Sequence, residues 1–205
     1  MKEAYLTISA PASGHLREKG SRFLSFAYPV RDEQEIQDRL SILQKEYFDA
    51  THHCFAWMLG VEGDRHRAFD DGEPGHSAGD PILGQIRSRG LTHVLVVVVR
   101  YYGGTNLGVG GLVKAYRGSA ALALEAASVV TVQVKHHWKL EFPYGTLPDV
   151  MKFAKGPGIE ILQKQIAEHC TLVVEVPPTV DPVVKLSGSA MHGIVVTCTR
   201  LPDRQ

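Results

Sequence analysis

The chain has 205 residues, of which 44% are hydrophobic and 21% charged, a composition typical of a soluble globular protein with a buried core. Its 22 basic and 22 acidic residues cancel, which excludes a bulk positive field, so any contact with nucleic acid requires a local patch. Three widely spaced cysteines and the lack of an apolar run near ~20 residues argue against a disulfide framework and a membrane span.

The chain is longer than the ~100–150 residues of an average domain, so we expect one or two domains. Its first thirty residues mix charged and small side chains and lack the apolar core of a signal peptide. Because the cysteines are odd in number and form no CxxC pair, a reducing compartment is indicated. The sequence therefore predicts a cytoplasmic protein without a membrane anchor.

Alternating polar and apolar residues predict two strands near the start of the chain, 5–9 and 21–28. Gly14 interrupts the stretch between them, which suggests a hairpin formed by these two strands. Residues 32–48 then change to the spacing of an amphipathic helix, for which Asp32 is the expected N-cap. The apolar residues on one helical face are Ile36, Leu40, Leu43 and Tyr47.

The middle of the chain predicts strands at 53–59 and 67–70 and a helix at 78–89, which Gly90 ends. Residues 92–102 follow as a continuous apolar run that is β-branched at its centre. Such a run is typical of a strand buried on both faces. We therefore expect residues 92–102 to lie at the centre of the sheet.

The C-terminal third predicts elements in the order β-α-β-β-α-β, which is that of a ferredoxin-like domain. These are a strand at 129–140, a helix at 147–154, strands at 159–163 and 171–176, a short helix after Pro182, and a strand at 193–199. The prediction is an α+β protein with two domains, residues 1–131 and 132–205.

A glycine-rich segment, 103–111, joins the expected central strand to an Ala- and Leu-rich helix at 112–127. Unpaired backbone amides at a helix start favour an anion, and glycines allow it to approach closely. Cationic side chains before and inside the helix would add contacts. A neighbouring tyrosine could stack on a base, although tyrosines beside the centre of a sheet more often fill core volume. The candidate anion-binding residues are Arg100, Tyr101, Gly103, Gly104, Gly108, Gly110, Gly111 and Lys114.

This segment matches neither common nucleotide-binding motif. A P-loop needs a glycine before a Lys-Ser/Thr pair, and the dinucleotide fingerprint needs a third glycine after Gly108 and Gly110. The glycines could instead serve only a tight turn and close packing of helix on sheet. The pattern alone leaves these two alternatives balanced.

Asp70, Asp71 and Glu73 place three carboxylates on a predicted turn. Such a cluster could hold a divalent cation or supply a general base. Capping of backbone amides by a solvated acidic turn is the more common role. We therefore predict no metal and no cofactor, and we keep the three residues as a candidate polar site.

The segment HHCFAW, residues 52–57, is expected to be a strand, so His52 and Cys54 share one face and His53 lies on the other. The two histidines therefore do not suit a single metal ion. Cys54 and His52 lack a third group that would orient the base of a nucleophile pair. His52 and His53 remain candidate residues of the polar site.

Three segments resemble the IMPACT family, including its bacterial YigZ-type members: HHCFAW, DDGEP with AG-x-P after it, and VVVVRYYGG with LG-x-GGLVKAY after it. The resemblance is dense from about residue 15 to residue 128. His76 and Ser77 stand where family members usually carry Gly and Thr. His76 adds bulk and a titratable group beside the candidate site.

The resemblance implies an N-terminal domain with the left-handed βαβ crossover shared by a ribosomal protein and the GHMP kinases. It implies a C-terminal domain similar to the fifth domain of elongation factor G. Eukaryotic members of the family regulate translation initiation. The implied role is therefore regulation in the translation apparatus, with RNA, the ribosome or a ribosome-associated protein as partner.

Three functional hypotheses follow. The first is a binding protein that recognises its partner through the glycine-rich, anion-binding face. The second is an enzyme that acts on a small phosphorylated or nucleotide substrate, with Asp70 or Asp71 as base. The third gives the motifs a purely structural role. We favour the first because no set of nucleophile, base and orienting group can be identified in the sequence.

Overall fold

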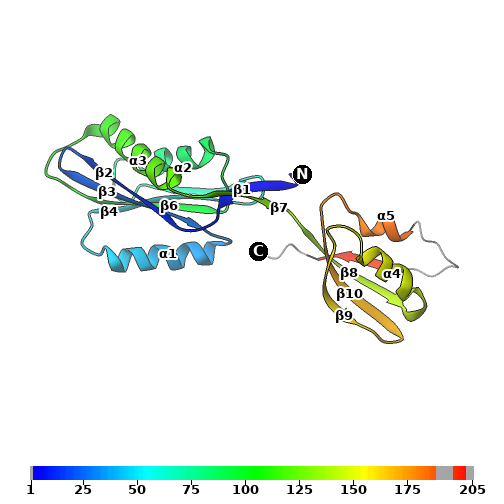
Figure 1. Ribbon diagram of the computed structural model, residues 1–205. Coiled ribbons are helices and arrows are strands. Elements are labelled where there is room, and N and C mark those ends of the chain that lie inside the picture. Colours follow the sequence, from blue (N-terminus) through cyan, green and yellow to red (C-terminus); the bar gives the residue numbers. More distant parts are fainter. Residues whose placement is uncertain (1, 188–195, 202–205) are drawn as a thin grey trace. The chain divides into compact units, whose positions relative to one another are not determined.

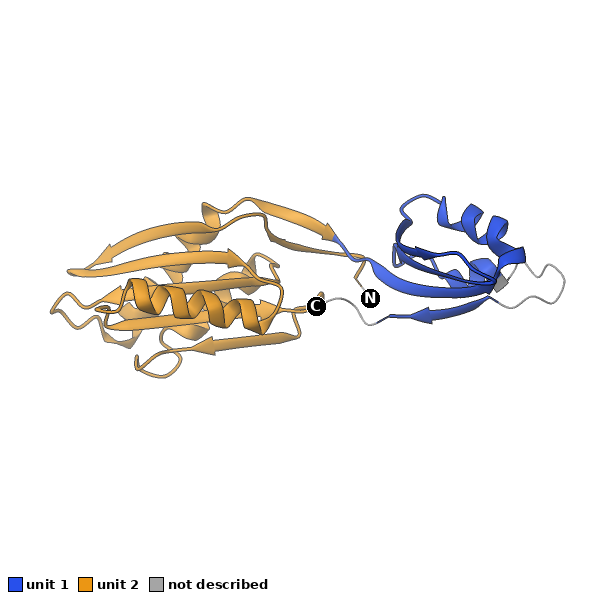
Figure 2. Ribbon diagram, turned by 90° about the horizontal axis from the view of Figure 1, so that it is seen from below, with its two compact units in different colours: residues 1, 133–205 blue, residues 2–132 orange. Residues whose placement is uncertain are grey.

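The computed structural model describes residues 2–187 and 196–201, which form two compact units (Figure 2). The first unit along the chain comprises Lys2–Val132 and is drawn in orange as unit 2 of Figure 2, whereas the second begins at Gln133 and is drawn in blue as unit 1. Both contain helices and strands, so the protein has a mixed α and β architecture with several sheets. No helix in the described ranges is long and apolar enough to cross a membrane.

The first unit contains seven strands and three helices (Figure 1). In chain order they are β1 (Ala4–Ile8), β2 (Ala12–Glu18), β3 (Ser21–Pro29), α1 (Glu33–Glu46), β4 (His52–Leu59), β5 (Arg65–Phe69), α2 (Gly79–Ser88), β6 (Val94–Tyr101), α3 (Gly108–Glu125) and β7 (Val129–Gln133), which ends at the boundary between the units.

The main sheet of this unit has five strands in the order β2-β3-β6-β4-β5, and all neighbours are antiparallel. Strand β6 lies at the centre of this sheet, and its apolar run Val94–Val99 is fully buried, as the sequence predicted. Helix α1 covers one face of the sheet, and helices α2 and α3 cover the other (Figure 1). The sheet therefore has a hydrophobic core on each face.

Strand β4 shows how the sequence supplies both cores. Cys54 and Ala56 point to the face covered by α2 and α3, whereas Phe55 and Trp57 point to the face covered by α1. This alternation follows from the two-residue period of a strand. The expected separation of His52 and Cys54 from His53 rests on the same period.

Helix α1 confirms the prediction made for residues 32–48. Asp32 is its N-cap, and the carboxylate accepts the Glu35 backbone N–H at 2.8 Å. The expected apolar face packs on the sheet, because Ile36, Leu40 and Leu43 are buried.

The hairpin expected between residues 5–9 and 21–28 is wrong. Strand β1 pairs with β7 in a separate two-stranded sheet, and the partner of β3 is the unexpected strand β2. Gly14, which suggested a break, lies inside β2. A Cβ at Gly14 would sit 2.7 Å from the Cβ of Leu122, so the glycine lets α3 pass close over the strand.

Helix α3 begins at Gly108, one turn earlier than the expected start at residue 112. The expected glycine-rich loop is therefore shorter, and three of its glycines belong to the first turn of the helix. The remaining connection, residues 102–107, is called the glycine-rich turn below.

The second unit follows the expected β-α-β-β-α-β order: β8 (His136–Pro143), α4 (Leu147–Ala154), β9 (Glu160–Gln165), β10 (His169–Val176), α5 (Pro182–Ser187) and β11 (Thr197–Arg200). Its sheet is antiparallel, in the order β11-β8-β10-β9. Helix α4 has the predicted bounds. The strand expected at 193–199 falls partly outside the described residues, and β11 accounts for its end.

Candidate functional site

The predicted site residues lie around one end of the five-stranded sheet, where β6 ends and β4 begins. Arg100 of β6 is paired in register with His52 of β4. The glycine-rich turn leaves the sheet directly after Tyr101 and leads into α3. The turn Asp70–Ser77 connects β5 to α2 beside them, and three of its residues, Asp71, Gly72 and His76, have positive φ.

A buried hydrogen-bonded group, called the Glu73 cluster, consists of Cys54, Glu73, Arg100 and Tyr116. The Arg100 Nη1–H donates to Glu73 Oε1 at 2.5 Å, and the Tyr116 hydroxyl donates to the same oxygen at 2.6 Å. Glu73 is 9% exposed and Arg100 is 4% exposed. Two expectations are therefore corrected: Glu73 is no solvated turn carboxylate, and the Arg100 fork is held by a carboxylate of the protein itself.

Cys54 and Tyr116 complete this cluster on the side of the core. The Cys54 S–H donates to the Asp70 carbonyl oxygen at 3.0 Å, and the sulfur lies 3.3 Å from the Tyr116 hydroxyl. Burial raises the pKa of the Cys54 thiol and of the Tyr116 hydroxyl far above their usual ranges. Both groups therefore stay protonated at neutral pH, and Cys54 is not a thiolate nucleophile.

The Asp70 carboxylate caps the start of α2. It accepts the backbone N–H groups of His76 at 2.9 Å, Ala78 at 2.9 Å and Gly79 at 2.8 Å. Burial acts to raise the pKa of Asp70, but these three bonds outweigh it and hold the pKa below its usual value. Asp70 therefore has the structural role considered from the sequence, which is the capping of backbone amides.

Asp71 binds the start of β4 rather than joining the other two carboxylates. Its Oδ2 accepts the His53 backbone N–H at 2.6 Å, and its carbonyl oxygen lies 2.7 Å from His52 Nδ1. His52 Nε2 lies 3.8 Å from Glu73 Oε1. The three carboxylates of residues 70–73 therefore have three separate partners and do not converge on one point.

The glycines of this site differ in what requires them. A Cβ on Gly103 would lie 2.0 Å from the Gly20 carbonyl carbon, and Gly104 and Gly108 have φ values of +82° and +68°. A Cβ on Gly111 would lie 3.0 Å from the Cβ of Leu107. A Cβ on Gly110 would meet nothing within 4 Å, so no neighbouring group requires glycine there.

The surface above the start of α3 is open. Gly103, Gly104, Gly108 and Gly110 are exposed, and no side chain caps the helix. Lys114 is exposed as well. Because α3 begins at Gly108, Lys114 belongs to the second turn of the helix.

Tyr101 does not join Arg100. It packs with the core under α1, on the opposite face of the sheet, and its hydroxyl donates to Asp49 at 2.8 Å. A sequence argument could have found this, because consecutive strand residues point to opposite faces. Ser21 was missed for lack of any signal: it is buried, and its hydroxyl accepts the Gly103 N–H at 3.2 Å.

Comparison with known proteins gives consistent matches. A family model described as the Impact N-terminal domain matches residues 19–124. The IMPACT family member YigZ of Escherichia coli is 40% identical over 124 residues, and the match spans 61% of its length. A Thermus thermophilus protein named IMPACT family member in pol 5′ region is 35% identical over 158 residues, which cover 77% of this chain and 85% of that protein.

A solved structure has the same architecture along the whole chain. It is described as the crystal structure of a hypothetical protein, and it covers 100% of both chains with a TM-score of 0.74 and 27% identity. The fold of both units is therefore shared with a protein whose description states no activity.

Proposed function

The chain belongs to the IMPACT family, and from this premise we propose that it is a regulatory binding protein of the translation apparatus. In this proposal the glycine-rich turn and the start of α3 bind phosphate groups of RNA, free or within the ribosome. Regulation of translation by eukaryotic members of the family supports the setting. The geometry of the glycine-rich turn and of the start of α3 supports the binding of phosphate.

One observation carries the proposal: the start of α3 is exposed and has no side-chain cap, and three of its first four residues are glycines. Backbone N–H groups at a helix start carry partial positive charge and seek acceptors. Glycine inside a helix lowers stability by about 1 kcal/mol relative to Ala, and no contact within the protein explains Gly110. A ligand that approaches the backbone closely would explain it.

Two basic side chains near this surface are Lys19 and Lys114. Arg17 and Arg22 lie opposite each other in the β2–β3 pair on the face of the sheet that α1 covers, where the Arg22 guanidinium stands 4.5 Å from the Tyr101 ring centre, so they do not line the start of α3. Lys19 stands in the turn whose next residue, Gly20, touches Gly103. Among the described residues, no carboxylate lies within ion-pair distance of any of these three side chains or of Lys114. A polyanion bound at the start of α3 would supply Lys19 and Lys114 with negatively charged partners.

Exposed aromatic rings lie beside the same end of the sheet. Phe48 is 82% exposed and Tyr102 is 46% exposed. The Tyr102 N–H donates to the Thr51 hydroxyl at 3.1 Å, which joins the glycine-rich turn to the segment that carries Phe48. Aromatic rings beside a basic surface are typical of proteins that bind single-stranded nucleic acid.

The alternative of an enzyme acting on a small phosphorylated substrate has less support. Cys54 and Tyr116 are buried and protonated, and the Asp70 carboxylate is held by three backbone N–H groups. Asp70 is therefore not free to act as the general base that this alternative required, and Asp71 Oδ2 already accepts the His53 backbone N–H.

We also propose a specific fold for each of the two units. Strands β3 and β4 are both antiparallel to β6, so they run in the same direction on either side of it and are joined through α1. This agrees with a split βαβ unit, to which we assign the left-handed crossover of the ribosomal-protein fold. The element and strand orders of the second unit agree with a ferredoxin-like domain similar to that of elongation factor G.

Co-sedimentation with purified ribosomes at rising KCl concentration tests the function. We expect binding that weakens as salt rises, because neutralised phosphates release counterions. Lys114→Ala should reduce the slope of log affinity against log salt by about 1. Lys152→Ala, which removes an exposed lysine of the second unit, should leave the slope unchanged. Absence of the protein from the pellet, or salt-independent pelleting, would contradict the proposal.

A further inference from the structure

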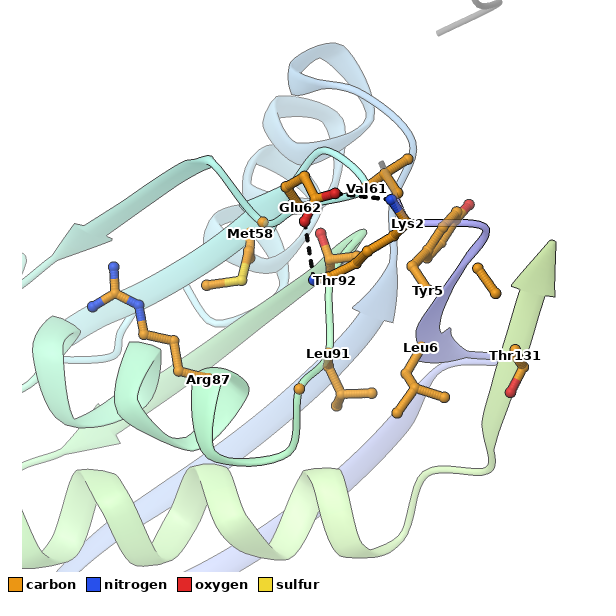
Figure 3. A pocket seen from close by; sticks show the side chains of 13 residues that line it. Lys2, Tyr5, Leu6, Met58, Val61, Glu62, Arg87, Leu91, Thr92 and Thr131 are labelled. Carbon is orange, nitrogen blue, oxygen red and sulfur yellow. Dashed lines mark hydrogen bonds and ion pairs between the residues drawn. The ribbon is translucent and has the colours of Figure 1, made fainter. Parts of the chain in front are cut away.

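Two cavities flank Tyr5, at the end of the main sheet opposite the glycine-rich turn. The larger, about 510 Å³, has charged groups that already have partners (Figure 3). Lys2 Nζ lies 3.4 Å from the Glu62 carboxylate, and Arg87 pairs with His66 at 2.7 Å. Arg87 also stands in the last turn of α2, where the helix carbonyls favour a cation. The larger cavity therefore shows no group that needs a ligand.

The smaller cavity, about 390 Å³, is lined by two arginines that lack such partners. Arg31 follows β3, and Arg39 lies on α1 with its guanidinium 5.2 Å from the Tyr28 ring centre. Within the described part of the chain, neither guanidinium lies near enough to a carboxylate to form an ion pair. Glu35, the carboxylate of the lining, instead accepts the Arg31 backbone N–H at 2.9 Å. The cavity therefore carries more positive than negative charge.

His93 forms another wall of this cavity in a strained conformation. Its φ is +54°, which is uncommon for a residue other than glycine. Its ring stacks on Tyr5 with centroids 4.5 Å apart, and its Nδ1 is buried without a hydrogen-bond partner. Strained backbone and unpaired buried polar atoms both lower stability, and both are concentrated at functional sites.

Burial and a neighbouring charge determine the protonation state of His93. Burial, assisted by the nearby Arg65, lowers the pKa of His93 below its usual value, so the ring is neutral at pH 7. Arg65 itself donates to Glu33 at 2.6 Å. The cations available to a ligand are therefore Arg31 and Arg39.

We propose that this cavity, between Tyr5, His93, Arg31 and Arg39, binds a small phosphate-bearing molecule. Two guanidinium groups match the charge and the several acceptor oxygens of a phosphate dianion. The neutral His93 ring adds a hydrogen-bonding group beside them. The cavity volume falls within the range of small-molecule sites, roughly 300–1,000 Å³.

This site is independent of the proposed function. It lies at the other end of β6 from the glycine-rich turn, and the two sites share no residue. Loss of one therefore leaves the other in place, and the two proposals can fail separately.

Isothermal titration calorimetry of the full chain tests the site with inorganic phosphate and, separately, ribose 5-phosphate. We expect saturable binding of at least one of them, and a stronger response to the ester identifies a phosphorylated metabolite rather than the free ion. Arg31→Gln and Arg39→Gln should each weaken binding about tenfold, the effect of losing one hydrogen bond to a charged group. Arg67→Gln, at an exposed arginine outside the cavity, should not.

Side-chain nitrogen NMR of labelled histidine adds a direct measurement. The His93 ring signals should shift on titration in the native chain and in Gly110→Glu, which alters only the glycine-rich site. Absence of heat and of any shift, equal affinity in all arginine variants, or loss of binding in Gly110→Glu alone would each overturn the proposal.

Discussion

Removal of the Glu73 carboxylate should destabilise the first unit strongly. In Glu73→Leu, Arg100 would remain buried, at 4% exposure, without the oxygen that accepts its Nη1–H at 2.5 Å. Loss of one partner from a buried ion pair lowers the free energy of unfolding by about 3–5 kcal/mol. With a urea dependence of about 1–3 kcal/mol per M, the unfolding midpoint should fall by roughly 2 M.

The double variant Arg100→Met/Glu73→Leu separates the pair from simple loss of packing. It removes both charges, so most of the stability should return, apart from about 1 kcal/mol for the Tyr116 hydroxyl that loses its acceptor. Urea unfolding followed by Trp57 fluorescence in a Trp138→Phe background reports on the first unit alone. A loss below about 1 kcal/mol in Glu73→Leu, or a double variant as unstable as the sum of the singles, would refute this reasoning.

Three further predictions concern the same end of the sheet. Asp70→Asn should lower stability at pH 7, and the difference should begin to shrink as the pH falls through the usual Asp pKa of about 4 and disappear only below the depressed pKa of the folded state, where the carboxyl is protonated; urea unfolding across pH checks this. Tyr116→Phe should lower the unfolding free energy by about 1–2 kcal/mol, measured in the same way, since Glu73 loses a buried donor. Gly103→Ala should lower the melting temperature, because its Cβ would lie 2.0 Å from the Gly20 carbonyl carbon; an unchanged temperature would contradict the close contact.

The elements that local pattern determines were predicted well from the sequence. Helix α1 combines an apolar face with a capping Asp32, and β6 is an uninterrupted β-branched run. Both signals lie within a few residues of the element they specify. Hydrophobic period and end chemistry were therefore sufficient to place them.

Strand pairing depended on contacts that no local pattern contains. Strand β1 pairs with β7, more than a hundred residues later in the chain, so the hairpin expected from proximity was wrong. Gly14 lowers the strand propensity of β2, yet the close passage of α3 requires a glycine there. The residue that misled the prediction is thus explained only by tertiary packing.

The sequence identified residues of the candidate site better than it identified what each residue does there. Glu73 and Arg100 were both selected, but their burial follows from a contact between residues 27 positions apart. Tyr116 reaches the same carboxylate from 43 positions away. Composition of the turn suggested solvated carboxylates, because nothing near Glu73 in the sequence announces its partners.

Comparison of Gly110→Glu with Gly84→Glu in ribosome co-sedimentation tests the central claim most directly. Each substitution adds a carboxylate to an exposed glycine of a helix, α3 or α2, where a Cβ meets nothing within 4 Å. Only Gly110→Glu places the charge at the start of α3, where it should leave the fold intact but repel an anion. We predict that Gly110→Glu abolishes salt-dependent pelleting while Gly84→Glu pellets like the native chain. Equal pelleting of the two variants would contradict the claim that the start of α3 binds phosphate.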